Sequence, residues 1–182
     1  IQWLKELGLP DENLINEVCS VLGVDWDAFL RDERPYLSHH QIKQMHADGF
    51  TIGAHTKTHR KLADLSDTEK ESEIIDSCLQ ITEITGQEIV PFSFPHSAYG
   101  VERNFLSDLR KRKPLLGLLF DTKDLRLDEK FIVNRVWAER PIAPTGDLRP
   151  LDEILRAAYR NAWVDGVMNL GRRLRGSNIA VQ

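Results

Sequence analysis

Residues 50–59 read Phe-Thr-Ile-Gly-Ala-His-Thr-Lys-Thr-His and carry the strongest structural signal of the chain. The first five residues are mostly apolar or β-branched, which predicts a buried strand over Phe50–Ala54. Two histidines, His55 and His59, follow that strand at a spacing of four. Residues four apart meet on one helical turn, so both imidazoles are expected to reach one metal ion. Imidazole suits zinc, iron, nickel and copper, and the spacing alone does not select among them.

Two capping boxes mark the helices on either side of this stretch. Ser38 with Gln41 predicts a helix that Gly49 ends, and Ser66 with Glu69 predicts a longer helix that stops at residue 86. The longer helix is expected to direct its apolar side chains toward a core, namely Ile74, Ile75, Cys78, Leu79 and Ile81. The histidine stretch therefore lies between two well-defined helices.

Short apolar segments alternate with these helices. Strands are expected over residues 89–95 and 115–120 and from residue 131, with a charged amphipathic helix over 101–113. This alternation predicts βα units around a mostly parallel sheet or barrel. The expected fold class is α/β, a distorted or partial (β/α) barrel with extra N-terminal helices and a C-terminal helix. The histidines would lie at the C-terminal ends of the strands, the face where barrel enzymes place their chemistry.

The length of 182 residues favours a single domain, in which we expect three parts. Residues 1–34 form a helical insertion or N-terminal extension, in which Asp25 caps a helix that carries Trp26, Phe29 and Leu30. Residues 35–140 form the α/β core, and residues 141–182 form a proline-rich connector and a final helix. The arginines of that helix are read as a solvated face rather than as a site for an anionic partner: Arg156, Arg160, Arg172, Arg173 and Arg175.

Composition narrows the class of protein. Hydrophobic residues make up 41% and charged residues 29%, the balance of a globular domain. The net charge of −4 argues against a nucleic-acid partner, which would favour a dominant basic face. No apolar run approaches the roughly 20 residues of a membrane span. Cys19 and Cys78 are too few for a disulfide framework or a cysteine zinc site.

Several other sites are excluded or given a plain structural interpretation. A helical zinc-protease motif needs glutamate where Thr56 stands, and neither a Gly-x-Ser-x-Gly elbow nor a phosphate-binding glycine loop occurs. The pair Asp121 and Asp124 could place a carboxylate at a strand end, but we interpret it as an ordinary exit from the strand into a loop. The histidines at positions 39, 40 and 46 belong to the capped helix and are not expected to be ligands.

The order of a strand, two histidines, a capped helix and a Phe-Pro strand end resembles the polysaccharide deacetylases, the NodB-homology family of metal-dependent carbohydrate esterases. The resemblance runs from about Tyr36 to Trp137. The family has a His-(Ser/Thr)-x-x-His motif whose histidines hold the metal, and His55, Thr56 and His59 stand in those places. A divalent metal, most often zinc, is the cofactor that the resemblance implies.

Residues 92–100, Phe-Ser-Phe-Pro-His-Ser-Ala-Tyr-Gly, resemble the family segment that lines the substrate groove. The resemblance implies that Phe94, Pro95 and Tyr99 contact substrate and that the backbone amide of His96 holds the oxyanion. His96 stands where the family has an aromatic residue, and Ser97 where it has glycine. The His96 side chain is interpreted as part of the groove wall, with a third metal ligand as the alternative.

The resemblance implies hydrolysis of acetyl groups from an N- or O-acetylated polysaccharide. In that mechanism the metal would polarise the acetyl carbonyl, a metal-bound water would attack it, an aspartate would take the water proton, and a histidine would protonate the leaving group. The family's aspartate motif, Thr-Phe-Asp-Asp, does not occur upstream of His55, and all six histidines lie at or before position 96. We expect the aspartates, and the first strands of the barrel, to lie in a segment before Ile1.

Two further readings stay open. The chain could be a degenerate member that binds carbohydrate without turnover, or the histidines could be structural only. An exposed sheet edge, left by missing strands, would favour a homodimer. The family resemblance suggests action outside the cytoplasm on cell-envelope sugar, but the sequence itself leaves the compartment unknown.

Overall fold

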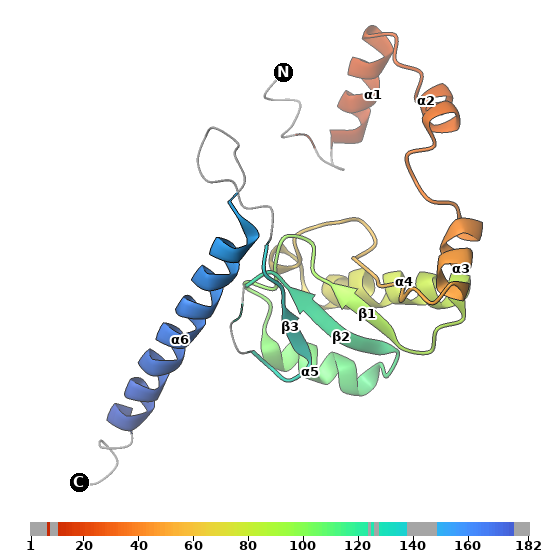
Figure 1. Cartoon of the computed structure of the whole chain (residues 1–182). Helices are drawn as coiled ribbons and strands as arrows, with labels where there is room; N and C mark the ends of the chain where they lie inside the picture. The colour runs from red at the N-terminus through yellow and green to blue at the C-terminus, as the bar shows by residue number, and fades with distance from the viewer. Residues whose placement is uncertain (1–6, 8–10, 124, 126–127, 138–148, 177–182) are drawn as a thin grey trace. The chain divides into compact units, whose positions relative to one another are not determined.

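The computed structural model describes residues 7, 11–123, 125, 128–137 and 149–176, with side chains up to residue 168 in the last of these ranges. The chain divides into two compact units, Ile1–Ile42 and Lys43–Gln182, and the division falls inside a helix. Figure 1 shows the elements of both units in chain order.

The first unit contains two short helices, α1 (Glu12–Val21) and α2 (Trp26–Glu33). The N-cap prediction at Asp25 is confirmed, because its Oδ1 accepts a hydrogen bond of 2.9 Å from the Ala28 amide. The rings of Trp26 and Phe29 meet edge to face at 5.9 Å. Neither helix has a buried residue. Local signals therefore define these helices, and they do not enclose a core of their own.

Helix α3 (His39–Ala47) begins and ends where the sequence predicts. The Ser38 amide donates to Gln41 Oε1 at 2.8 Å, and the Gln41 amide donates to Ser38 Oγ at 3.3 Å, which completes the capping box. At the other end, Gly49 has a φ of 95° and its amide donates to the carbonyl of His46. The chain then enters the histidine stretch.

Helix α4 (Asp67–Thr85) is the longest element of the core. Its predicted capping box at Ser66 and its left-handed stop at residue 86 are both confirmed. Ile74, Ile75 and Cys78 are buried as expected, but the prediction for Leu79 is wrong, because this side chain is 51% exposed. Leu79 points about 100° away from Cys78 around the helix and therefore lies off the buried face that carries Ile74, Ile75 and Cys78.

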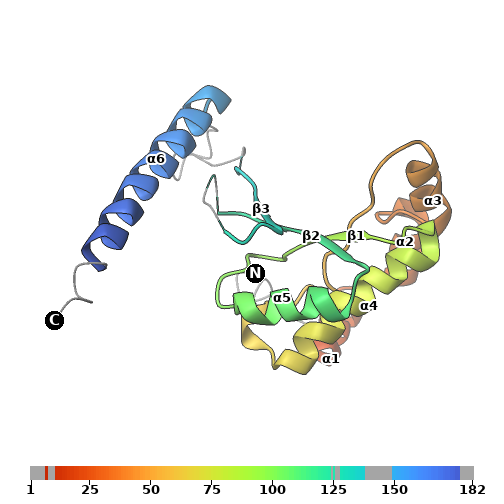
Figure 2. The same cartoon turned by 90° about the horizontal axis from the view of Figure 1, so that it is seen from below.

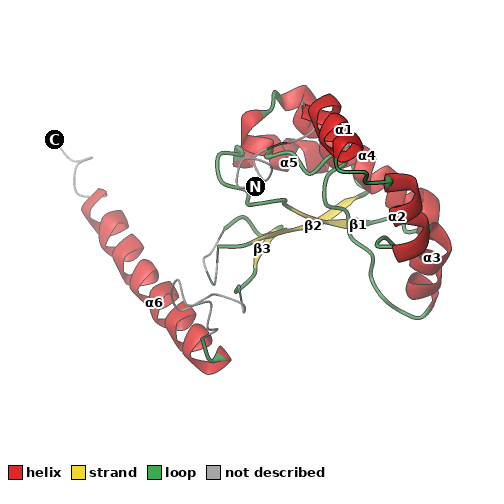
Figure 3. Ribbon diagram, turned by 90° about the horizontal axis from the view of Figure 1, so that it is seen from above, coloured by secondary structure: helices red, strands yellow, loops and turns green. Residues whose placement is uncertain are grey.

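Three parallel strands form the sheet: β1 (Val90–Ser93), β2 (Leu116–Asp121) and β3 (Ile132–Asn134), in the order β1-β2-β3. Helix α5 (Arg103–Arg112) connects β1 to β2. Figures 2 and 3 show α4 and α5 on the same side of this sheet. Between sheet and helices lies the core, whose fully enclosed side chains include Leu62, Ile74, Val90, Phe92, Leu106, Leu109 and Leu119.

The other face of the sheet is partly open among the described residues. Phe120 pairs with Val133, so both side chains point to this face together with Leu118. Leu118 is 46% exposed and Val133 is 39% exposed, although parallel sheets are usually covered on both faces. The α/β class and the parallel sheet are confirmed. The barrel stays a prediction, because the described strands form an open sheet.

The predicted strand Phe50–Ala54 is wrong in extent, since only Ala54 pairs with β1, through a parallel bridge to Phe92. The Ala54 amide donates to the Pro91 carbonyl at 2.8 Å, and the Ser93 amide donates to the Ala54 carbonyl at 2.9 Å. The next donor along the ladder would be the nitrogen of Pro91, which carries no hydrogen.

The side chain of Gln87 takes the place of that missing strand neighbour. Its Nε2 donates to the Ile52 carbonyl at 3.0 Å and its Oε1 accepts from the Ile52 amide at 3.2 Å. Both polar backbone groups of Ile52 are thereby satisfied without a ladder. The segment stays extended beside β1, and this places His55 at the carboxyl end of that strand.

Helix α6 (Leu151–Gly176) follows a segment, 138–148, that lies outside the described residues together with Pro141 and Pro144. Ile154 and Ala158 are buried, whereas Tyr159 and Trp163 are largely exposed. Among the described helices, none combines the length and the apolar character needed to span a bilayer.

Candidate metal site

The two predicted metal ligands lie on a tight loop and not on a helical turn, which corrects the expectation from their spacing. Thr56 and His59 both adopt left-handed backbone conformations, with φ values of 62° and 59°. The Thr56 hydroxyl donates to the His55 carbonyl at 2.6 Å and accepts from the His59 amide at 3.0 Å. One threonine side chain thus closes the loop between the two histidines.

The loop brings the two imidazoles together, as the sequence predicts. The ring centroids of His55 and His59 lie 4.9 Å apart, edge to face. Nδ1 of His55 lies 2.7 Å from the carbonyl oxygen of Ser93, at the end of β1. Because a carbonyl only accepts, Nδ1 carries the proton in this contact, and in the neutral form of the ring Nε2 is the nitrogen with the lone pair. Metal-binding histidines commonly have this arrangement, in which the second ring nitrogen is fixed by a carbonyl.

A buried carboxylate on α4 holds the same loop from the protein side. Glu73 is 7% exposed and accepts hydrogen bonds of 2.9 Å from the amides of Lys57 and Thr58, and another from the Thr58 hydroxyl. Burial opposes ionisation of Glu73, but the bonds from Thr58 and Lys57 outweigh burial and hold the pKa of this carboxyl below its ordinary value. The sequence analysis missed Glu73; its one signal is a glutamate beside the buried residues Ile74 and Ile75.

His96 lies next to this pair. Its ring centroid is 5.2 Å from that of His59, and its side chain is exposed. The left-handed conformation of this turn falls on His96 itself, with φ 61°, and not on Ser97, where the family pattern has glycine. The His96 amide makes no hydrogen bond with another described residue. Three of the four non-glycine residues with positive φ in the described chain therefore lie in or beside the histidine pair.

The three residues predicted to contact substrate differ in how far their side chains are buried. Phe94 is 2% exposed, packs edge to face against Phe92 at 5.3 Å and belongs to the core. Pro95 is also fully buried. Both side chains are thus buried in this structure, and their contact with substrate stays a prediction. Tyr99 is 72% exposed, with the ammonium of Lys123 over its ring at 5.6 Å.

Asp121 is more than the ordinary strand exit that the sequence analysis expected. The residue ends β2, is fully buried, and accepts hydrogen bonds through Oδ1 from the amides of Ala98 and Thr122, at 2.9 and 2.8 Å. It therefore does place a carboxylate at the C-terminal end of a strand. Its predicted companion, Asp124, lies outside the described residues.

The donor set for a metal is incomplete within the described part of the chain. There, no three His, Cys, Asp or Glu side chains form a group that could hold a metal ion. His46 instead places Nδ1 3.3 Å from the Phe50 carbonyl, at the end of α3. The described residues thus bring together two potential nitrogen ligands, His55 and His59, and no third potential ligand lies beside them in this part of the chain.

Comparison with models of known protein families shows to which family this chain belongs. Residues 14–113 match the family model of polysaccharide deacetylase, and this match covers more than half of the sequence. The chain therefore belongs to the polysaccharide deacetylase family, and the resemblance found in the histidine stretch is confirmed. No curated protein and no solved structure matches the chain. Family membership suggests a deacetylase-like hydrolase that acts on carbohydrate, on carbon–nitrogen bonds other than peptide bonds.

The match and the three expected parts of the chain do not share boundaries. The family match begins at residue 14, inside the segment expected to be an insertion or extension, and it ends at residue 113, before β2. The histidine loop, α4, β1 and the turn at His96 all lie within it. The division into 1–34, 35–140 and 141–182 stays a prediction.

Proposed function

We propose that this chain carries the metal-binding and substrate-facing part of a hydrolase that removes acetyl groups from an N- or O-acetylated polysaccharide. The observation that carries the proposal is the histidine pair with rings 4.9 Å apart, of which His55 is fixed through Nδ1 on the Ser93 carbonyl. Family membership supports the reaction class. The exposed position of both histidines leaves the site open to a long polymer.

The two histidines fit a divalent metal, most simply zinc, because neutral imidazole is a preferred ligand and one ring already has its second nitrogen engaged. His55 and His59 would hold it. Such an ion supplies Lewis-acid polarisation of a carbonyl and lowers the pKa of water. The remaining ligand and the general base would be carboxylates of the kind that the family's aspartate motif supplies, and no third ligating side chain lies beside the pair within the described residues.

This chain's own groups would orient the acetylated sugar. The amide of His96, which has no partner among the described residues, would donate to the developing oxyanion. The exposed Tyr99 ring offers an apolar face for a sugar ring, and the buried Phe94 and Pro95 support the turn beneath it. Water adds to the acetyl carbon, the bond to nitrogen or oxygen breaks, and the leaving group takes a proton, so acetate and a free amine or hydroxyl result.

A second candidate function is binding without turnover. It draws on the absence, within the described residues, of a third metal-ligating side chain beside the pair. A module of this kind would retain the exposed Tyr99 and the open face and would bind an acetylated glycan as a lectin does. It differs from the enzyme in one measurable respect, the release of acetate.

Acetate release separates the two functions. We would assay the full-length gene product, loaded with zinc or cobalt, on N-acetylated chitotetraose and on an O-acetylated xylan, with the His55→Ala variant as the inactive reference. Metal-dependent acetate release that is lost in the variant supports the enzyme. Binding of either glycan by the loaded protein without acetate release would replace the enzyme with the binding module.

A further inference from the structure

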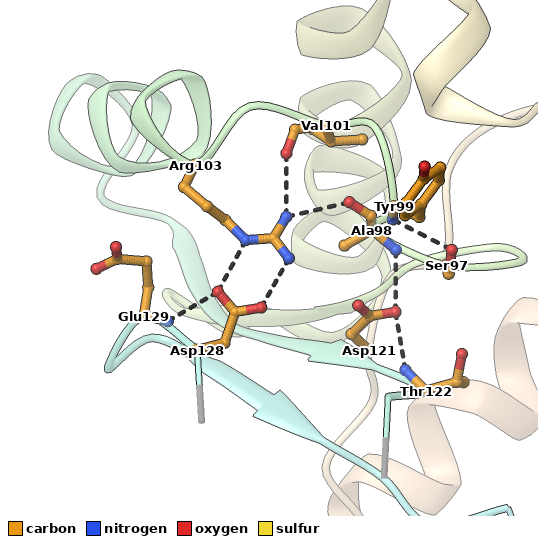
Figure 4. A network of polar contacts seen from close by, with 9 residues as sticks. All are labelled: Ser97, Ala98, Tyr99, Val101, Arg103, Asp121, Thr122, Asp128 and Glu129. Atoms are coloured by element: carbon orange, nitrogen blue, oxygen red, sulfur yellow. Dashed lines mark hydrogen bonds and ion pairs between the residues drawn. The ribbon is translucent and has the colours of Figure 1, made fainter. Parts of the chain in front are cut away.

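The loop from residue 96 to 101, hereafter the His96 loop, is held through both backbone groups of one small residue. The Ala98 amide donates to Asp121 Oδ1 at 2.9 Å, and the Ala98 carbonyl accepts from Arg103 Nη1 at 3.0 Å. Ala98 itself is fully buried. Figure 4 shows the two side chains approaching Ala98 from different elements, Asp121 from the end of β2 and Arg103 from the start of α5.

Arg103 is the centre of this network. Its Nη1 also donates to the Val101 carbonyl at 3.0 Å, while Nε and Nη2 bind the two carboxylate oxygens of Asp128 at 2.8 and 2.7 Å. The pair is largely buried, with side chains 25% and 15% exposed. Hydrogen bonding to Asp128 raises the pKa of Arg103, so the guanidinium stays charged. The planar guanidinium of Arg103 binds one carboxylate and two carbonyl groups at the same time. The single ammonium group of a lysine could not make this set of contacts.

Asp121 fixes the loop from the sheet. Its Oδ2 is buried and makes no hydrogen bond within the described part of the chain. A buried carboxylate oxygen without a partner is unfavourable, so this aspartate calls for an explanation beyond packing. The neighbouring Thr122 extends the same attachment, because its hydroxyl donates to the His96 carbonyl at 3.2 Å. The carboxyl end of β2 thus binds the His96 loop at two successive residues.

The conformation of His96 requires such support. A histidine at φ 61° is strained and persists only where its surroundings over-determine it. The flanking attachments at His96 and Ala98 supply that constraint, and the ring of His96 consequently lies 5.2 Å from that of His59. The amide of His96 is left without a partner among the described residues, at the place where the proposed reaction needs a donor.

We propose that Arg103 and Asp121 are positioning residues that hold the His96 loop against the histidine pair, and that they act on the reaction through the His96 amide and not through the metal. The inference rests on the proposed function for its catalytic consequence. Its structural consequence is independent of that function: loss of either side chain frees the Ala98 backbone and separates His96 from His59, while His55 and His59 keep their own supports at Ser93 and Glu73.

The test uses the full-length protein and four variants. Asp121→Ala removes both amide contacts, Arg103→Lys removes the fork, and Thr122→Val removes only the hydroxyl on His96. Arg112→Lys is the matched control, because Arg112 makes a similar two-point contact with Glu71, at 3.1 and 2.9 Å, far along α5 from the loop. Amide hydrogen exchange at Ala98, ring contacts between His59 and His96 by NMR, zinc affinity and acetate release are measured on each.

Asp121→Ala and Arg103→Lys should raise amide exchange at Ala98 by about tenfold or more and abolish the His59–His96 ring contact. Zinc affinity should stay within about twofold of wild type, whereas kcat should fall by roughly ten- to a hundredfold, less than the roughly hundred- to thousandfold for removal of an oxyanion donor, because the His96 amide is displaced and not lost. Thr122→Val, the mildest change, should weaken the ring contact without altering the unfolding temperature. Arg112→Lys should match wild type in every readout.

Three outcomes would overturn the inference. One is unchanged exchange at Ala98 in both Asp121→Ala and Arg103→Lys. Another is a loss of zinc affinity equal to the loss of kcat, which would mean that the network supports the whole site. The third is an unchanged ring contact in Thr122→Val together with unfolding of the two stronger variants, which would make the network a general stability element. If wild type releases no acetate, the proposed function fails, while exchange and ring contact still decide whether these residues position the loop.

Discussion

The Nδ1 atom of His55 lies 2.7 Å from the carbonyl oxygen of Ser93, and this contact joins the histidine loop to the end of β1. Ser93 is itself bonded back to the loop, since its amide donates to the Ala54 carbonyl at 2.9 Å. The strand therefore fixes both the backbone before His55 and the orientation of its ring. This double attachment engages Nδ1 of His55 and leaves Nε2 as the ring nitrogen that a metal would bind.

Metal content after dialysis should depend on both histidines of the loop. Wild type loaded with zinc is expected to retain close to one ion per chain, and His55→Ala or His59→Ala should lose it, because each removes one of the two proposed nitrogen ligands. His40→Ala is the control, since His40 is an exposed residue of α3. Elemental analysis measures the content, and retention of zinc by both loop variants would contradict a site on this pair.

Replacement of Glu73 should destabilise the fold through the histidine loop. Glu73→Ala leaves two amides and a hydroxyl of the loop without their acceptor, so the free energy of unfolding should fall by roughly 2–4 kcal/mol. Glu83→Ala, an exposed position on the same helix, should change it by less than about 0.5 kcal/mol. Urea unfolding followed by circular dichroism gives both free energies. Equal losses in the two variants would show that Glu73 does not stabilise the fold through the histidine loop.

The Glu73 carboxylate should make the stability of the fold depend on pH in the acidic range. The folded-state pKa of Glu73 lies below the ordinary value of 4.5, so its contribution is fully present above that value and is lost as the pH falls through the folded pKa. Wild type should therefore lose more stability than Glu73→Gln when the pH is lowered from about 5.5 to about 3. Thermal unfolding at a series of pH values tests this, and parallel curves for the two proteins would contradict it.

Gly100 should not tolerate a side chain. Its φ is 78°, and a Cβ there would lie 2.9 Å from the Cβ of Ala63, whose backbone is part of the turn after the histidine loop. Gly100→Ala should cost about 2–4 kcal/mol, combining left-handed strain with overpacking. Gly86→Ala is the matched control, because Gly86 has the same φ of 78° but open space around it, and it should cost only about 1–2 kcal/mol.

The difference between these two glycine variants isolates the contact with Ala63. Equal losses of unfolding temperature in Gly100→Ala and Gly86→Ala would show that backbone strain alone, and not the contact with Ala63, lowers stability. Double replacement, Gly100→Ala with Ala63→Gly, should recover part of the loss because it removes the opposing Cβ. This rescue separates a local contact from a general loss of packing.

Local sequence signals determined the helices and the identity of the loop. Ser38 with Gln41 and Ser66 with Glu69 form capping boxes that close within three residues, so neither depends on a distant partner. The pairing of His55 with His59 was likewise predicted from a spacing of four. The family could be inferred from the same stretch, and its confirmed match includes these residues.

Tertiary structure decided the conformation of the loop and the depth of its neighbours. A spacing of four is equally compatible with a helical turn and with the closed loop that Thr56 forms. That loop is held by hydrogen bonds to Glu73 and Ser93, which join residues at least 15 positions apart in the sequence. Pro91 shortened the expected strand because its nitrogen could not complete a ladder that only parallel pairing defines. Asp121 was found to bind Ala98 for the same physical reason: hydrogen bonds between distant segments depend on the packing of the sheet, which no local pattern records.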